Sequence, residues 1–128
     1  MKQDLRGLIL SKQDIQTEKV HIPEWDTDVY IKGLTGTERD SYEASLFTVT
    51  ESGKKVDVKM NRANVRAKLL VKTICDEDGS RVFSDADVEA LGSKSAAALD
   101  KLFEVAQRLS GLSDKDVEEL EKNSNSEA

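Results

Sequence analysis

An apolar pattern with helical spacing near the end of the chain constrains the fold most strongly. Between Ser93 and Ser110, apolar side chains recur every three or four residues, which places them on one face of a helix. The members of this predicted core face are Ala98, Leu99, Leu102, Phe103, Ala106 and Leu109. Gly111 follows, at a position where glycine commonly ends a helix. Such a helix must bury its apolar face, so the rest of the chain has to supply packing partners.

The same helix-start pattern occurs twice. Phe83–Leu91 and Leu112–Leu120 each place a serine directly after a large apolar residue, with an acidic residue three positions beyond that serine. A serine N-cap followed by an acidic residue at the third helical position is a variant of the capping box. The pattern predicts that a helix begins at each place. Two copies are too few to indicate a repeat architecture.

Two further helices are predicted upstream. Thr35 with Glu38 forms another capping-box pair, with Thr37 and Asp40 as a rival register, and the helix started there is expected to reach about Phe47. Ser52-Gly53 marks a break. After it, apolar residues at helical spacing predict a helix over residues 60–74.

One β-hairpin is predicted near the N-terminus. The β-rich runs Val20–Ile22 and Val29–Ile31 flank a turn-forming stretch that begins with Pro23. The run Leu8–Leu10 is compatible with a short docked strand. The predicted fold class is therefore mainly α with a small N-terminal β-hairpin (α+β), in a compact helical domain. The expected organisation is a loosely ordered segment 1–18, a helical domain with the β-hairpin 19–111, a C-terminal helix 112–122 and a disordered tail 123–128.

Composition excludes several classes of protein. The chain of 128 residues has a net charge of −6 and a single cysteine, so no internal disulfide framework is possible. Its apolar runs are too short to span a bilayer, and the N-terminus does not have the pattern of a signal peptide. These features predict a cytoplasmic protein that acts without a membrane.

Residues 53–75 carry a net charge of +6 within this acidic chain. On the predicted helix over 60–74, Val65 and Leu69 form a narrow apolar strip opposite the core face. The basic residues that border the strip are Arg62, Arg66, Lys68 and Lys72. The favoured interpretation is internal: the strip contacts a second neighbour, and the cations balance acidic segments of the same domain. The alternative is a docking surface for an acidic amphipathic helix. Nucleic-acid binding is disfavoured because the block has no interleaved aromatic residues.

Candidate chemistry is sparse. Asp76–Asp87 partly fits a twelve-residue calcium loop, but Arg81 stands where the loop needs glycine. Calcium therefore stays a minor alternative to a simple turn. Cys75 lies beside acidic residues, which disfavour a thiolate, so an inert thiol is expected. No catalytic motif occurs, and we expect neither an enzyme nor a cofactor.

Several stretches together resemble a known family. They are Trp25–Tyr30, Leu34–Asp40, Arg81–Phe83 with Asp85–Leu91, Lys94–Ala96, Leu102–Phe103 and Leu109–Leu112. In this order, over roughly residues 20 to 120, they resemble the tail assembly chaperones of long-tailed bacteriophages. The resemblance implies a small, mainly helical protein that acts in the host cytoplasm and is absent from the finished virion. It also implies binding to the tape measure protein, recruitment of tail-tube subunits and, in some members, self-association.

Two candidate partner-binding surfaces follow from the residues. The first is the basic-edged strip of Arg62, Val65, Arg66, Lys68, Leu69 and Lys72. The second is the predicted C-terminal helix with Leu112, Val117 and Leu120. The alternative function is a structural head–tail connector or tail-tube component that stays in the virion.

Overall fold

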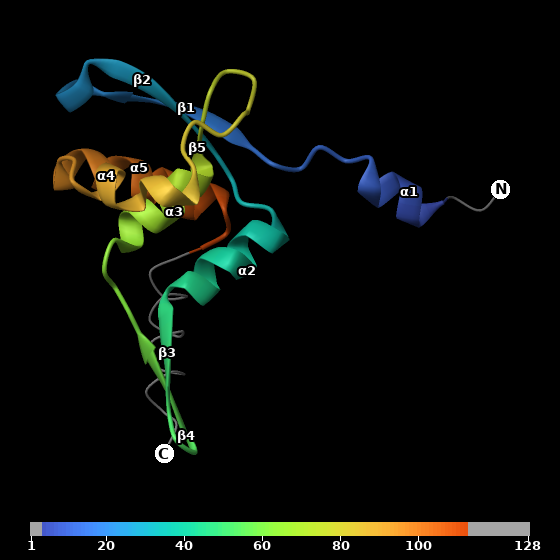
Figure 1. The fold of residues 1–128 in the computed structure, drawn as a ribbon. Coiled ribbons are helices and arrows are strands. Elements are labelled where there is room, and N and C mark those ends of the chain that lie inside the picture. Colours follow the sequence, from blue (N-terminus) through green and yellow to red (C-terminus); the bar gives the residue numbers. More distant parts are fainter. Residues whose placement is uncertain (1–3, 113–128) are drawn as a thin grey trace.

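The computed structural model describes residues 4–112, in which five strands form two sheets beside a layer of helices (Figure 1). Along the chain the elements are α1 (Leu5–Leu10), β1 (Thr17–Ile22), the 3-10 helix η1 (Pro23–Trp25), β2 (Thr27–Lys32), α2 (Gly36–Ser45), β3 (Phe47–Ser52), β4 (Lys55–Met60), α3 (Val65–Thr73), β5 (Ile74–Cys75), the 3-10 helix η2 (Asp85–Asp87), α4 (Val88–Gly92) and α5 (Ala96–Leu109). Of the described residues, 46% are helical and 25% are in strands. The prediction of a mainly α fold with only an N-terminal hairpin is therefore wrong, and the fold is α+β.

The first sheet contains the predicted hairpin. Strands β1 and β2 pair antiparallel with Val20 opposite Val29, and η1 forms the turn between them. Pro23 begins that turn, where its missing N–H group costs no ladder hydrogen bond. Strand β5 adds to the other edge of β2 and places Cys75 opposite Tyr30, which the sequence pattern did not predict.

The core lies between this sheet and the helices α3, α4 and α5. The predicted apolar face of α5 is confirmed: Ala98, Leu99, Leu102 and Ala106 are buried, while Phe103 and Leu109 are partly buried against the same core. Burial of these side chains provides the main stabilising free energy of such a helix, because isolated short helices are marginal in water. The sheet contributes Ile22 and Ile31, which are both fully buried.

The predicted caps also form. The Thr35 hydroxyl accepts from the Glu38 backbone N–H at 3.1 Å, and the Glu38 carboxylate accepts from the Thr35 N–H at 2.9 Å. Ser84 and Asp87 make the corresponding box at the start of η2. Gly111, just beyond α5, has φ +71°, a conformation that favours glycine. Ser95 is the N-cap of α5, so the helix begins two residues beyond Ser93, where the stretch with helical spacing was taken to start.

Residues 47–60 form a second hairpin that was not predicted. Strands β3 and β4 pair with Phe47 opposite Met60 and Val49 opposite Val58. The helix expected over residues 60–74 is correspondingly shorter and begins at Val65, because Met60 belongs to β4 and Asn64 is left-handed with φ +57°. The second hairpin projects away from the body of the protein (Figure 1).

The predictions for the two ends of the chain have different outcomes. Leu8, Ile9 and Leu10, for which the sequence allowed a short strand, belong to α1 instead. This helix lies away from the rest of the fold in Figure 1. The C-terminal helix and the tail predicted for residues 112–128 lie outside the described residues, apart from the buried Leu112. The division of the chain into segments therefore stays a prediction. Over residues 4–112, no helix combines the length and the hydropathy that crossing a bilayer requires.

Tyr42 supplies a test of the core. Its side chain is 1% exposed, and its hydroxyl has no hydrogen-bond partner among the described residues. We expect Tyr42→Phe to raise the free energy of unfolding by about 1 kcal/mol, because a buried unpaired hydroxyl is removed. Urea unfolding measures this difference, with Tyr42→Ala as a control that loses several kcal/mol. A less stable phenylalanine variant would contradict the expectation.

The same tyrosine makes stability depend on pH. Burial, with a smaller contribution from the Glu43 carboxylate, raises the pKa of Tyr42 from 10.0 to about 12. Between these values the unfolded chain loses the phenolic proton and the folded chain keeps it, so unfolding becomes more favourable as pH rises. Below pH 10 this residue has no such effect. We expect the wild type to lose stability between pH 10 and 12 more steeply than Tyr42→Phe, as measured by urea unfolding at each pH.

Candidate protein-binding surfaces

The predicted apolar strip on α3 is not an exposed surface. Leu69 is fully buried in the core, and Val65 is half-buried and packs against the same core. Helix α3 contacts α2, α4 and α5, so neighbours cover the side on which the strip was expected. Leu69 therefore stabilises the fold and is not available to a partner in this structure.

Lys72, predicted at the edge of the strip, lies inside the protein. Only 8% of the residue is exposed, and its ammonium lies 3.3 Å from a carboxylate oxygen of Asp85. The Arg81 guanidinium donates to the same carboxylate at 2.9 Å and also to the Val71 carbonyl. These hydrogen bonds, first that of Arg81 and then that of Lys72, hold the pKa of Asp85 below its ordinary value. Asp85 therefore neutralises two cations at the end of α3.

Two more basic residues of α3 have partners within the chain. Arg66 donates to Asp100 of α5, and the Lys68 ammonium donates to the Ser45 carbonyl at the end of α2 at 3.0 Å. The internal interpretation of the basic block is confirmed for Arg66 and Lys72, whose partners are acidic residues of the same domain.

Part of the predicted surface remains accessible. Arg62 and Arg66 are exposed and, with Val65, line a small pocket of about 160 Å³ at the start of α3. Gly92 and Lys94 also line this pocket. The structure thus brings three of the six residues together and assigns Leu69 and Lys72 to the interior. In the second candidate surface Leu112 is 5% exposed, while Val117 and Leu120 lie outside the described residues.

The second hairpin presents an apolar face to solvent. Residues that are opposite each other in an antiparallel pair point to the same side of the sheet. The register therefore gathers Val49, Val56 and Val58 on one face, where they are 60%, 64% and 43% exposed and where Glu51 stands opposite Val56. The other face carries Thr48, Thr50, Ser52, Lys55, Asp57 and Lys59. This apolar hairpin face (Val49, Val56, Val58) was missed from the sequence, although apolar residues alternate with polar ones along both strands.

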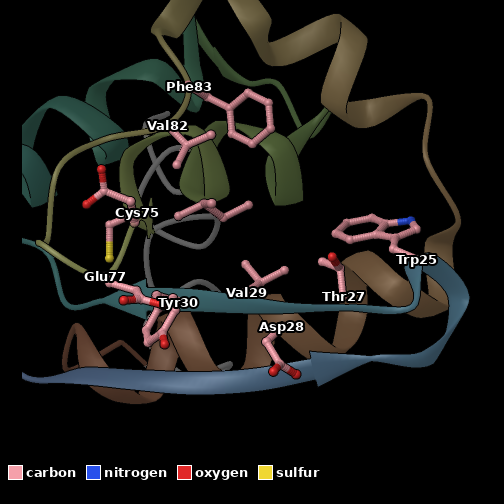
Figure 2. Close-up of a pocket in the computed structure, with 11 residues that line it drawn as sticks. Trp25, Thr27, Asp28, Val29, Tyr30, Cys75, Glu77, Val82 and Phe83 are labelled. Carbon is pink, nitrogen blue, oxygen red and sulfur yellow. The ribbon is translucent and has the colours of Figure 1, made fainter.

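A larger groove lies beside the first sheet (Figure 2). It has a volume of about 410 Å³ and extends along β2 and β5 beneath the segment that follows β5. Val29 from β2 points into it from one side, and Val82 and Phe83 line the other. We call this the β2–β5 groove; its full lining is Trp25, Thr27, Asp28, Val29, Tyr30, Ile74, Cys75, Asp76, Glu77, Val82 and Phe83. Most of its surface is apolar, which is typical of a protein or ligand contact.

Polar groups around the groove have structural uses. Burial, together with the Asp76 carboxylate, raises the pKa of the Cys75 thiol despite the opposing effect of Lys32, so the thiolate is disfavoured. A carboxylate oxygen of Asp76 accepts from the backbone N–H groups of Asp78 and Ser80 and thereby shapes the turn. In the part of the chain from residue 4 to 112, no three His, Cys, Asp or Glu side chains converge as metal ligands would. The Asp76 carboxylate therefore has a structural use within this turn.

Comparison with known proteins identifies the family. A sequence model of phage tail assembly chaperones matches residues 4–123, so the chain belongs to the phage tail assembly chaperone family. This confirms the resemblance found in the sequence. The fold also resembles the solved structure of the tail assembly chaperone of bacteriophage HK97, with a TM-score of 0.55 and 20% identity over 84% of this chain and 98% of that chain. At that identity, the likeness concerns the fold alone. No curated protein matches the sequence. Chaperone is a non-catalytic role.

Removing the acidic partner from each of two ion pairs of the basic block tests how much each pair contributes to the free energy of unfolding. Asp85→Ala leaves the nearly buried Lys72 without its carboxylate. Asp85 itself is 67% exposed, so water screens part of the interaction, and we expect a loss of about 1–2 kcal/mol in the free energy of unfolding. Asp100→Ala removes the partner of Arg66, but both side chains of that pair are about half exposed, so we expect a loss below about 1 kcal/mol. Urea unfolding at neutral pH measures both values. Equal losses would contradict a structural role specific to Asp85.

Proposed function

We propose that this protein is a tail assembly chaperone that binds the tape measure protein in the host cytoplasm and recruits tail-tube subunits around it. The observation that carries the proposal is the family match over residues 4–123. It is supported by exposed apolar surface on a strongly charged protein, because a chaperone must cover apolar segments of its client and remain dissolved while doing so.

The apolar hairpin face is the surface that best fits a client protein. Its three valines are exposed on a two-stranded hairpin, which by itself has little stability in water. A partner segment with apolar residues would remove this face from water. The patch is small, so the contact would be weak and reversible, as a chaperone that is later displaced by tube subunits requires. A second contact is the accessible remainder of the predicted strip, formed by Arg62, Val65 and Arg66.

The hairpin face can be tested by co-expression with the tape measure protein of the same phage. We expect the tagged wild-type chain to retain the tape measure protein on affinity resin. Val49, Val56 and Val58 together changed to Gln should lower the amount retained by about tenfold or more, because burial of three valines is lost. Quantitative immunoblotting of the eluate measures the retained fraction.

Matched variants separate this surface from general damage to the hairpin. Thr48, Thr50 and Ser52 changed to Gln alter the polar face of the same hairpin and should leave retention unchanged. Val65→Asp probes the second contact, and because Val65 packs partly against the core, circular dichroism checks the fold of this variant too. Normal retention by the valine variant, with circular dichroism showing an intact fold, would remove the apolar hairpin face as the binding site.

Mass spectrometry of purified virions distinguishes the chaperone from the alternative of a retained connector or tube component. We expect no stoichiometric amount of this chain in mature particles. A fixed copy number in the virion would overturn the chaperone proposal.

A further inference from the structure

The apolar hairpin face belongs to an element that has little stability of its own. Strands β3 and β4 pair only with each other, and no third strand joins them in the described part of the chain. A two-stranded hairpin is marginally stable in water unless another element covers its apolar side. Val49, Val56 and Val58 are nevertheless between 43% and 64% exposed. A further segment is therefore needed to remove this face from water.

This face continues outward from the hydrophobic core. Phe47 stands opposite Met60 at the base of the hairpin. Alternate residues of a strand share a face, so this pair lies on the same side as Val49 and Val58. Phe47 and Met60 are partly buried and pack against the core. The hairpin therefore presents one apolar surface that begins at the core and becomes exposed toward the tip.

The described chain ends at the same core. Leu112 is 5% exposed and belongs to the core cluster. The preceding Gly111 lies beside α2, since a Cβ at that position would be 3.9 Å from the Arg39 guanidinium. Helix α2 leads through the buried Leu46 into β3, and in Figure 1 the coloured chain ends above the base of the hairpin. The residues that follow Leu112 therefore start close to the apolar surface that they would cover.

Residues 113–122 lie outside the described part of the chain, but their sequence has the properties that the hairpin face requires. The capping pattern predicts a helix from Ser113, on which Val117 and Leu120 are three positions apart and share a side. A helix of this length spans about 15 Å, whereas the six residues of β3 span about 20 Å. The segment is therefore long enough to cover most of the hairpin.

The two segments are opposite in charge. Residues 113–122 carry five acidic and two basic side chains. Residues 47–62 carry four basic and two acidic side chains, and Lys54 and Lys55 stand at the tip of the hairpin. The carboxylate of Glu51, on the apolar face, lies near these two lysines in the sequence. An acidic segment with an apolar side is therefore the kind of occupant that this hairpin attracts.

We propose that residues 113–122 dock on the apolar hairpin face of the same molecule, with Val117 and Leu120 against Val49 and Val58. The segment is tethered to the core, so its effective concentration at the hairpin is high. A small apolar contact is then enough to hold it in place. The contact uses one chain and needs no other phage protein.

The docked segment regulates the client site. This consequence rests on the proposed function, in which the same hairpin face binds the tape measure protein. A client must first displace residues 113–122, so its apparent affinity falls with the fraction of molecules in which the face is covered. The chain thereby keeps its apolar face out of water until a client with a larger apolar surface takes the place of its own segment.

Hydrogen–deuterium exchange of the full chain tests the docking without any client. Val117→Gln with Leu120→Gln removes the apolar side of the segment and leaves the net charge unchanged. We expect the amides of β3 and β4 to exchange about tenfold faster in this variant than in the wild type, because the uncovered hairpin opens more often. The amides of β1 and β2 should exchange as in the wild type, which checks that the core is folded.

The matched control for this variant is Lys115→Gln with Glu119→Gln, on the opposite side of the predicted helix. It also leaves the net charge unchanged and should exchange like the wild type. Equal exchange of β3 and β4 in the wild type and in the Val117→Gln, Leu120→Gln chain would overturn the docking.

A carbodiimide cross-linker, which joins lysine to carboxylate without a spacer, locates the segment. We expect cross-links between the hairpin lysines Lys54, Lys55 and Lys59 and the acidic residues of 113–122. An equal mixture of unlabelled and isotopically labelled chain distinguishes one molecule from two, because both halves of an intramolecular product carry the same label. Products of mixed label, or no cross-link between these segments, would contradict docking within one molecule.

Co-expression with the tape measure protein tests the regulatory consequence. The Val117→Gln, Leu120→Gln chain should retain about two- to fivefold more tape measure protein than the wild type, because the competing segment is released. An unchanged amount, in a variant whose hairpin exchanges faster, would overturn the regulation. If no version of the chain retains the tape measure protein, the proposed function fails, while exchange and cross-linking still decide the docking.

Discussion

The burial of α3 is the constraint on which the rest of the structure depends. From Leu69 to Cys75 every residue is buried, including the polar Lys72 and Thr73. Thr73 satisfies its hydroxyl by donating to the Leu69 carbonyl at 3.0 Å. The chain then continues directly into β5, which joins the first sheet. Helix and sheet therefore share one core, and α5 packs against both α3 and the first sheet.

The burial of α3 explains why its basic residue Lys72 has an acidic partner within the same chain. A cation placed within a buried helix end requires an anion nearby, since an unpaired buried charge is costly. Asp85 supplies it for Lys72 and binds Arg81 as well, which ties the segment after β5 to α3. Within the basic block, Arg66 and Lys72 thus have their acidic partners inside the same domain. The same segment then continues over the sheet, where Val82 and Phe83 form one wall of the β2–β5 groove.

The apolar surface that remains exposed is divided between separate elements. The second hairpin and the N-terminal arm (residues 4–16) both project from the body. Their valine and leucine side chains are exposed and lie outside the core. The groove is a concave part of the body itself. The hairpin and the groove are therefore separate surfaces, so variants of one leave the other intact.

The sequence by itself determined those features that depend on neighbouring residues. The capping box of Thr35 with Glu38, the core face of α5 and the first hairpin are local patterns, and the family resemblance rests on stretches that contain them. The second hairpin also carries a local signal, the alternation along β3 and β4, but the sequence analysis interpreted Ser52-Gly53 only as a break between two helices. Only the tertiary structure decided that Leu69 is buried and that Val29 and Val82 face one groove. Such facts depend on which elements far apart in the chain pack together. Helical spacing shows that α3 has two apolar sides, but it does not show which neighbouring element covers each side.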